Sequence, residues 1–377
     1  MYKIGSTNGS VTTRISKLYY NSHVDKRTIA VVKTWDKLGY CEKYILADFE
    51  HILTPHPFYT NGHTEWFKFA GDESRLIGII ESILSSFNRQ EDMKLVKPSY
   101  EFIEQQNGLD GLYKHIELIG RTCYKSEDKI TPDSAKTFVD RLVKSGHLAM
   151  VEHGTLYLVM SHAINRGIID PIYVKALRYK NNKYSKVASF EKDIDGKRVA
   201  VYYITTNLRV LIENKWQNDL KYLSEPQDEH PKRYTVKFIC DRGVSHEFVR
   251  HRVMSFAQES TRYCNYSKDK FGNELTFIQP CWMPSSEWCE NDKAGHIFLQ
   301  TLKMSEGLYL ELLSEGWKAQ EARAILPNAL KTELVVTGFA EDWNHFFSLR
   351  DDKAHAHPQA YELAHPLHEE FKNKGIL

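Results

Sequence analysis

One short polar stretch has the residue types to bind a multiply charged anion. It begins with Arg250-His251-Arg252 and continues, seven residues later, with Ser260-Thr261-Arg262-Tyr263. Arginine stays charged at any working pH, and its planar fork of donors suits phosphate or carboxylate. The neighbouring hydroxyl groups can donate to the same ligand. The stretch therefore indicates a nucleotide-like ligand, although a solvated basic helix face would have the same composition.

The spacing limits how these side chains can share one ligand. A helix turns by about 100° per residue, so three consecutive side chains fan over roughly 200°. We therefore expect Arg250, His251 and Arg252 either to lie at a helix end or to serve two ligands on different sides.

Regular elements on both sides must position this stretch. A strand over residues 234–240, followed by Asp241-Arg242-Gly243 and a short helix, leads into it, and such a turn places donors at an anion. Further strands are expected over residues 156–160, 199–206 and 332–337. Helices are expected over residues 109–120, 132–145, 208–223, 291–313, 318–326, 341–350 and 361–371. The helix at 132 has Thr131 as its expected N-cap, the helix at 208 has Asn207, and Gly146 is an expected stop. Residues 163–198 are polar and read as a loop.

Composition narrows the class of protein. With 377 residues, 42% of them hydrophobic, the chain can bury a large core and carry more than one domain. Its formal net charge of +1 argues against a dedicated nucleic-acid binder. No apolar run approaches a membrane span, and no signal-peptide core precedes residue 30. The six cysteines include no CxxC pair, so reduced thiols and a cytoplasmic location are expected.

Two domains are expected. Residues 1–97 read as a small α+β module of unknown role, with strands over 28–35 and 44–49 and an amphipathic helix over 74–87. Residues 98–377 read as a mixed α/β catalytic domain, in which a central sheet is flanked by helices.

Other chemistries must be weighed against the anion site. Arg323 and Arg350 each have apolar neighbours, so each should pair with either a carboxylate or a ligand. Cys123 and Cys264 could act as nucleophiles, but structural thiols are the more common case. A metal-dependent nucleotide hydrolase would use histidine and carboxylate ligands. The candidate ligands are His147, Glu152, His153, His355, His357 and His365.

Five segments, taken in order, resemble the flavin-dependent thymidylate synthases. Arg250-His251-Arg252, seven residues and Ser260 are similar to that family's RHR signature. The other four segments are Arg121-Thr122-Cys123-Tyr124, Gly146-His147 with Glu152-His153, Arg323 to Pro327, and His345 to Arg350. The resemblance extends over about residues 98–377 and leaves out the N-terminal module and residues 163–198.

The resemblance implies a reaction and an assembly. Members methylate dUMP to dTMP, with methylenetetrahydrofolate as carbon donor and FAD, reduced by NADPH, as hydride source. They form homotetramers whose sites are shared between subunits, and they need no cysteine nucleophile, metal, membrane or nucleic acid.

The resemblance also implies roles for individual residues of this chain. Arg350 is the implied catalytic residue, since a fixed cation beside uracil favours its N3-deprotonated form. The implied dUMP contacts are Glu247, Arg250, Gln258, Glu259, Ser260, Thr261, Arg262, Arg323 and Arg350. The implied FAD contacts are His147, Arg250, His251, Arg252, Gln258 and His345.

The chain departs from the family pattern at several flavin-side positions. Glu247 stands where members often have Gln, and Ala257-Gln258 replace Asn-Glu. Phe339-Ala340-Glu341 replace an Asn-x-Arg flavin contact, and His345 stands where some members use Asn. The nucleotide-binding arginines are all present.

Overall fold

The structure, a computed structural model, describes residues 2–3, 54–55, 66–68, 94–165, 169–283 and 293–377. The chain divides into two compact units, Met1–Met93 and Lys94–Leu377. In the first unit a small antiparallel sheet has the order β1-β3-β2. Its strands are β1 (Tyr2–Lys3), β2 (Thr54–Pro55) and β3 (Trp66–Lys68). The strands and helix predicted within residues 28–87 lie outside the described residues.

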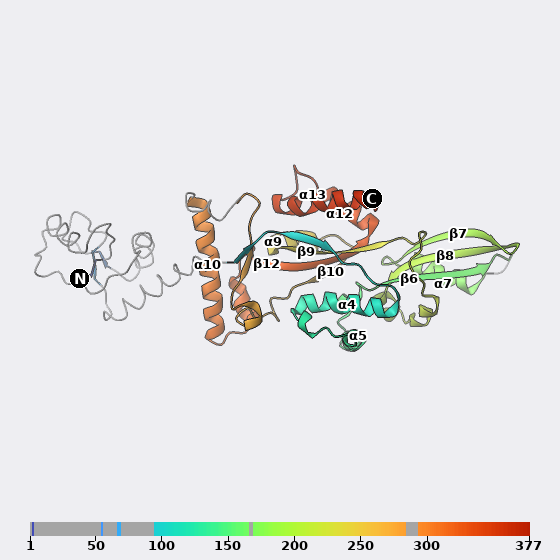
Figure 1. Cartoon of the computed structure of the whole chain (residues 1–377), viewed down its shortest axis with the longest axis horizontal. Helices are drawn as coiled ribbons and strands as arrows, with labels where there is room; N and C mark the ends of the chain where they lie inside the picture. Colours follow the sequence, from blue (N-terminus) through green and yellow to red (C-terminus); the bar gives the residue numbers. More distant parts are fainter. Residues whose placement is uncertain (1, 4–53, 56–65, 69–93, 166–168, 284–292) are drawn as a thin grey trace, which may run out of the picture. The chain divides into compact units, whose positions relative to one another are not determined.

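The second unit mixes helices and strands along the chain, which confirms the predicted mixed α/β class (Figure 1). Its first half comprises β4 (Lys94–Val96), β5 (Ser99–Phe102), α4 (Gly108–Tyr124), η4 (Glu127–Lys129), α5 (Ser134–Lys144), α6 (Leu148–Val151), β6 (Thr155–Ala163), α7 (Pro171–Lys180), β7 (Lys186–Ile194), β8 (Lys197–Asn207), α8 (Leu208–Glu213) and η5 (Gln217–Tyr222). Its second half comprises β9 (Arg233–Asp241), α9 (Arg242–Phe248), β10 (Ser255–Gln258), η6 (Asp269–Phe271), β11 (Thr276–Ile278), α10 (Lys293–Ser314), α11 (Ala319–Ala322), η8 (Arg323–Ile325), β12 (Lys331–Phe339), α12 (Ala340–Arg350) and α13 (Pro358–Asn373).

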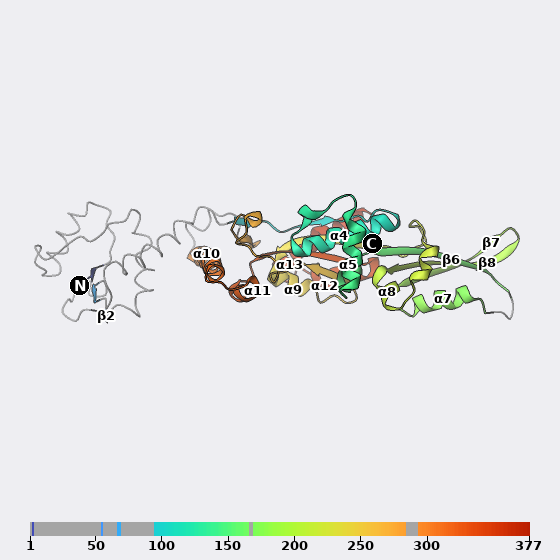
Figure 2. The same cartoon turned by 90° about the horizontal axis from the view of Figure 1, so that it is seen from below.

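A four-stranded antiparallel sheet of order β10-β12-β9-β5 lies between two helical layers. Helices α12 and α13 cover one face and α4 covers the other, with α5 packed on α4 (Figures 1 and 2). Because successive strand residues point to opposite faces, one face of β9 and β12 collects the apolar positions. Phe238 and Leu334 there are fully buried against Trp343, Phe346 and Phe371. This face forms the main hydrophobic core.

The face of the same sheet toward α4 is partly polar. The hydroxyl of Thr235 on β9 lies 3.3 Å from Nε2 of His115 on α4, and 2.8 Å from the hydroxyl of Thr337 on β12. Lys237 and Glu333, also on this face, form an ion pair at 3.6 Å. Hydrogen bonds and ion pairs therefore hold much of this interface, because buried polar groups must find partners.

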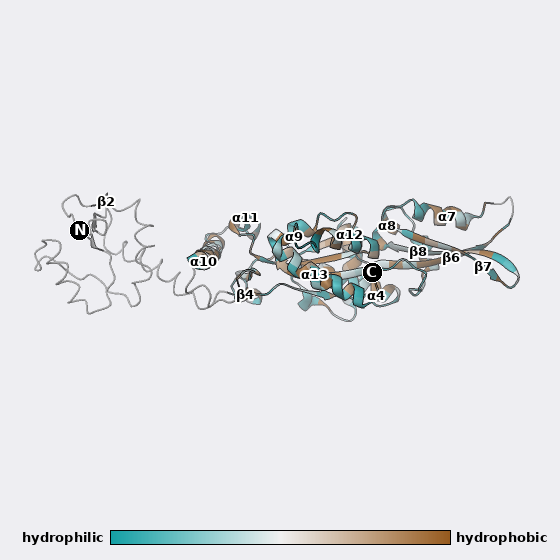
Figure 3. Cartoon of the chain, turned by 90° about the horizontal axis from the view of Figure 1, so that it is seen from above, coloured by the Kyte–Doolittle hydropathy of each residue, from teal (hydrophilic) through white to brown (hydrophobic). Residues whose placement is uncertain are grey.

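A second antiparallel sheet, β6-β8-β7, corrects the prediction of a loop over residues 163–198. Pro171 stands at the first position of α7, and Asp170 caps it by accepting from the Ile172 amide at 2.7 Å. β7 pairs with β8 along its whole length, yet most of its side chains are exposed. Figure 3 shows the hydrophilic colouring of this hairpin at its tip. A two-residue turn, Asp195-Gly196, joins β7 to β8, so hairpin pairing with the next strand, and not an apolar face, stabilises β7.

The helix predicted over residues 208–223 is interrupted. Asn207 caps its start as predicted, by accepting from the Val210 amide at 3.1 Å. The chain then leaves the helix at Lys215, whose φ of 59° is left-handed, and resumes as the 3₁₀ turn η5. The helix predicted over residues 318–326 is likewise divided into α11 and η8.

The other boundaries are close to prediction. Gly146, with φ of 72°, follows α5 and confirms the predicted stop. Thr131 is not the N-cap of α5, because Asp133 occupies that position and the helix begins at Ser134. Helix α4 runs on to Tyr124, four residues beyond the predicted end. None of the described helices combines the length and apolar character that a bilayer crossing requires.

Candidate functional site

The RHR stretch lies in a turn just past the end of a helix. Asp241 caps α9, since its Oδ1 accepts from the Val244 amide at 2.7 Å, and the helix ends at Phe248. The turn places Arg250 and Arg252 at the surface and leaves His251 only 3% exposed. The structure therefore has these three residues just past a helix end, with two side chains exposed and one buried.

Arg350, the last residue of α12, is fixed against this turn by three hydrogen bonds. Its Nη1 donates to Oε2 of Glu247 at 2.6 Å, and its Nη2 donates to the Glu247 carbonyl at 3.0 Å. Its Nε donates to Nε2 of His251 at 3.0 Å. These bonds occupy three of the five guanidinium N–H groups and, within the described residues, leave one on each terminal nitrogen for a ligand. Arg350 thus pairs with a carboxylate and can still meet a ligand.

The hydrogen bond from Arg350 determines which ring nitrogen of His251 carries the proton. Because Arg350 Nε is a donor, His251 Nε2 must accept, and its proton sits on Nδ1. Burial, followed by the nearby charges of Arg350 and His345, lowers the pKa of His251 to about 4, so the ring is neutral. Its Nδ1 is buried and has no partner among the described residues. His345 lies beside it, with ring centroids 5.8 Å apart.

A second cluster forms around Ser260, just after β10. The Ser260 amide donates to the Cys123 carbonyl at 3.0 Å, which ties this turn to the end of α4. The Ser260 carbonyl accepts from the amides of Tyr263 and Cys264 at 3.1 and 2.9 Å. The ring of Tyr263 also meets that of Tyr124 edge-on at 5.3 Å. The early Arg121-to-Tyr124 segment and the Ser260 segment are therefore direct neighbours.

Two arginines at this turn have no carboxylate partner among the described residues. Arg323 donates through Nη1 to the Thr261 hydroxyl at 3.3 Å, and Arg262 lies over the Tyr263 ring at 5.5 Å. Both arginines are exposed, whereas Thr261 is buried. Within the described residues, two guanidinium groups that no carboxylate neutralises lie beside this turn, and such groups could bind a phosphate or carboxylate. Of the two partners expected for Arg323, a carboxylate or a ligand, the described residues supply no carboxylate, which leaves a ligand.

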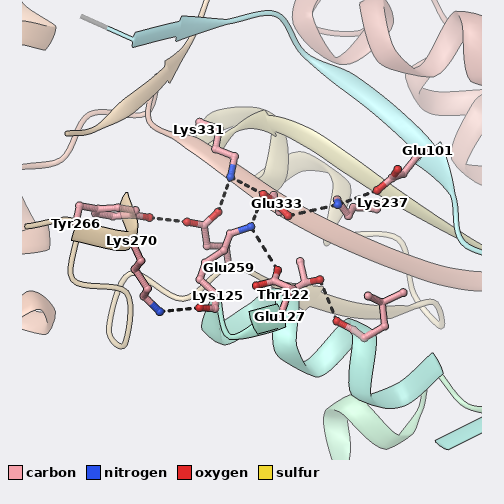
Figure 4. Close-up of polar contacts among 11 residues, drawn as sticks. Glu101, Thr122, Lys125, Glu127, Lys237, Glu259, Tyr266, Lys270, Lys331 and Glu333 are labelled. Carbon is pink, nitrogen blue, oxygen red and sulfur yellow. Dashed lines mark hydrogen bonds and ion pairs between the residues drawn. The ribbon is translucent and has the colours of Figure 1, made fainter. Parts of the chain in front are cut away.

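Two predicted contacts have other partners in the structure. The side-chain amide of Gln258 donates to the hydroxyls of Ser245 at 2.8 Å and Thr332 at 3.3 Å. Glu259 is buried, and its carboxylate accepts from the Tyr266 hydroxyl and from Lys331 (Figure 4). Sequence reasoning missed Lys331. The signal that could have indicated Lys331 is its spacing from Glu333, since two polar residues two positions apart in a strand lie on the same face of the sheet.

The remaining predicted positions lie elsewhere. His147 is exposed at the start of α6, and within the described residues no contact joins it to either cluster. Ala257 is buried beside Ile119, Cys123 and Val335. At the start of α12, Phe339 donates its amide to Asp342 at 2.9 Å.

The histidines proposed as metal ligands are held in separate contacts. His153 is buried, and its Nδ1 lies 2.8 Å from the Thr337 hydroxyl. His355 and His365 contact Asp352 and Asp351 at 2.7 and 2.8 Å. Across the described ranges, no three His, Cys, Asp or Glu side chains gather as a metal site would require.

Both candidate nucleophilic thiols are buried. Burial, with neighbouring negative groups, raises the pKa of Cys123 and that of Cys264 to about 12. Because the thiolate is the nucleophile, two thiols that stay protonated suit packing better than catalysis.

Two family models match separate parts of the chain. The family model described as "Thymidylate synthase complementing protein" matches residues 228–374, which contain both arginine clusters but not residues 121–153. A second family model, "T5orf172 domain", matches residues 1–84.

Similar curated proteins include two flavin-dependent thymidylate synthases. That of Geobacter sulfurreducens is 35% identical over 109 residues, which cover 29% of this chain and 43% of the relative. That of Clostridium tetani is 28% identical over 202 residues, which cover 49% of this chain and 76% of the relative. The chain thus spans less than half of the first relatives that it matches. A solved UMP/dUMP methylase PolB from Streptomyces cacaoi, bound with 5-Br dUMP, is 16% identical with a TM-score of 0.35, over 74% of this chain and 93% of that one.

Proposed function

We propose, on the premise that residues 228–374 belong to the thymidylate synthase complementing protein family, that this chain methylates dUMP to dTMP. Methylenetetrahydrofolate is the proposed carbon donor and NADPH the proposed reductant. We assign the reaction to residues 98–377. The observation that carries the proposal is the pair of arginines, Arg262 and Arg323, that flank a hydroxyl-bearing turn without a carboxylate partner among the described residues.

The Ser260 turn is the proposed phosphate site. A nucleotide phosphate accepts several hydrogen bonds and carries close to two negative charges, so it matches two guanidinium groups and two hydroxyls. Ser260 and Thr261 supply the hydroxyls, and Arg262 and Arg323 supply the charge. The bond from Arg323 to Thr261 holds one guanidinium in place before any ligand arrives.

Arg350 is the proposed activating residue at the uracil. Glu247 and His251 orient its guanidinium, and two N–H groups remain to donate to the ring. A cation held in this way stabilises negative charge on the uracil, and so favours the N3-deprotonated form. That charge makes the ring carbon more nucleophilic toward the incoming one-carbon unit. Because three protein bonds position Arg350, the site needs little reorganisation during the reaction.

The residues near the RHR turn fit a flavin. FAD, once bound and reduced, supplies the hydride that completes the methyl group. The Nδ1–H of His251 has no acceptor among the described residues, so it could donate a hydrogen bond to a flavin. Arg250 and Arg252 are exposed, and their positive charges suit a pyrophosphate. The ring of His345 meets that of His251 edge-on, with centroids 5.8 Å apart. A flavin contact by His147 stays a prediction.

The spacing of the two clusters supports a site shared between subunits. The RHR turn precedes β10 and the Ser260 turn follows it, and the four residues of this strand separate the two turns by about 10 Å. We propose a cytoplasmic homotetramer in which the Arg350 cluster of one subunit meets the Ser260 turn of another. Each dUMP would then be held by two chains.

Ligand binding tests this assignment. Isothermal titration of the FAD-loaded protein should detect dUMP, while deoxyuridine, which lacks the phosphate, should bind at least about a hundredfold more weakly. Arg323→Met should narrow that difference. Equal affinity for dUMP and deoxyuridine would show that no phosphate site exists at the turn.

A further inference from the structure

A buried group of ion pairs forms around Glu259, Lys331 and Glu333 (Figure 4), and Glu259 immediately precedes Ser260. Glu259, the residue before Ser260, is 3% exposed. Its Oε1 accepts from the Tyr266 hydroxyl at 2.8 Å, and its Oε2 accepts from Lys331 Nζ at 3.0 Å. Lys331 Nζ also donates to Oε1 of Glu333 at 2.6 Å. One lysine therefore serves two buried carboxylates.

The same group ties the turn to its neighbours. Besides contacting Lys331, the Glu333 carboxylate pairs with Lys125, the residue that ends α4. The backbone is fixed as well, since the Glu259 amide donates to the Glu333 carbonyl at 2.8 Å. Ser260 is thus held between α4 and β12 by contacts on both sides, before any ligand binds.

Charge balance in this group depends on Lys331. Burial alone lowers the pKa of Lys331, but Glu259 and Glu333 outweigh it and leave that pKa above its ordinary value. Burial also raises the pKa of Glu333, yet Lys331 and Lys125 bring it down to about 2. Without Lys331, Glu259 would be a buried carboxylate with no ion-pair partner among the described residues, which is costly. It would also place an uncompensated negative charge next to the residue that is to receive a phosphate.

We propose that Lys331 is a positioning residue for the nucleotide phosphate, and that Glu259 faces Lys331 and does not touch dUMP. Lys331 neutralises the Glu259 carboxylate and keeps it directed into the protein. Ser260, Thr261 and Arg262 are then free to receive a dianion without repulsion from the adjacent residue. This inference rests on the proposed function, because it assumes that dUMP binds at the Ser260 turn.

Four variants and a control test the inference, with dUMP titrated into the FAD-loaded protein and steady-state kinetics measured beside it. Lys331→Met should raise the Kd and KM for dUMP about tenfold, the effect of one uncompensated carboxylate charge near the phosphate. The flavin spectrum and kcat at saturating dUMP should not change. Lys331→Arg, which keeps the charge, should restore most of the affinity. Glu259→Gln should bind dUMP as well as the unaltered protein does.

The double variant Lys331→Met with Glu259→Gln gives the sharpest comparison. It should regain most of the lost affinity, because the carboxylate that repels the phosphate is gone. Lys237→Met is the matched control. Lys237 contacts Oε2 of Glu333 at 3.6 Å and Glu101 at 2.7 Å, whereas Lys331 contacts Oε1 of Glu333 and also Glu259. The control variant should leave the Kd for dUMP unchanged. Thermal unfolding of every variant separates lost affinity from lost stability.

Two results would overturn the inference while leaving the proposed function intact. One is a Lys331→Met variant that binds dUMP normally. The other is a Glu259→Gln variant that loses as much affinity as Lys331→Met, which would show direct contact between Glu259 and dUMP. If Lys331→Met does not fold, the double variant decides, and a loss of affinity there also overturns the inference. Failure of the unaltered protein to bind dUMP would instead reject the proposed function.

Discussion

Replacement of Arg350 by alanine should abolish catalysis and leave the fold intact. The variant loses three hydrogen bonds, to Glu247 Oε2, the Glu247 carbonyl and His251 Nε2. The ion pair with Glu247 is only partly buried, with side-chain exposures of 17% and 31%, so its loss should cost about 1 kcal/mol of stability. Glu247 can be hydrated once it is unpaired. A domain of this size has roughly 5–15 kcal/mol of stability, so the protein should remain folded.

The effect on the reaction should be much larger. A preorganised donor aimed at developing charge is worth about 2.7–4 kcal/mol, or a factor of 10²–10³ in kcat. The rate of dTMP formation at saturating dUMP should therefore fall by at least about a hundredfold. Flavin absorbance should persist, since Arg250, Arg252 and His251 remain. The midpoint of thermal unfolding should fall by only a few degrees.

The neighbouring histidine provides an independent readout of the same change. Burial is the main cause of the low pKa of His251, and the charge of Arg350 is the next. In Arg350→Ala the pKa of His251 should therefore rise above about 4, yet stay below its ordinary value. Titration of the ring by NMR measures this shift. A variant with normal kcat, or an unchanged His251 titration, would refute the reasoning about Arg350.

Three further outcomes follow from other contacts. Arg323→Met should weaken dUMP binding about tenfold or more in calorimetry without loss of flavin, because it removes one phosphate cation. Asp241→Ala should lower the free energy of unfolding by about 1 kcal/mol in urea titrations, through loss of the cap on α9. The pKa of Glu333 is depressed to about 2, so its contribution to stability is present above pH 4.5 and lost as the pH falls toward 2. Glu333→Gln should flatten that part of the pH–stability curve.

Local signals in the sequence predicted much of the fold. Asn207 and Gly146 were predictable because a cap or a left-handed stop is determined by one residue and its immediate neighbours. The apolar alternation of β9 and β12 likewise indicates buried strands. β7 was missed because its mostly exposed side chains show little apolar alternation, although Asp195-Gly196 is a local signal for the hairpin turn that joins it to β8. The break at Lys215 was also hidden within a helical repeat.

In the candidate site too, local sequence predicts some features, whereas others depend on residues far away in the chain. Arginines and hydroxyls with a fixed spacing reveal an anion site by residue type alone. The contacts that hold them are non-local: Lys331 reaches Glu259 across 72 residues, and Arg350 reaches Glu247 across 103. Nothing in the local sequence distinguishes Glu259, which faces Lys331 in the interior, from a residue that faces a ligand.

Transfer of the one-carbon unit tests the central claim most directly. The FAD-loaded protein should be incubated with dUMP, NADPH and methylenetetrahydrofolate that carries ¹³C in the methylene group, and the nucleotides analysed by mass spectrometry. We predict dTMP with the label in its methyl group, and no product when the folate or NADPH is left out. Recovery of unlabelled dUMP alone, from protein that holds flavin and binds dUMP, would contradict the account.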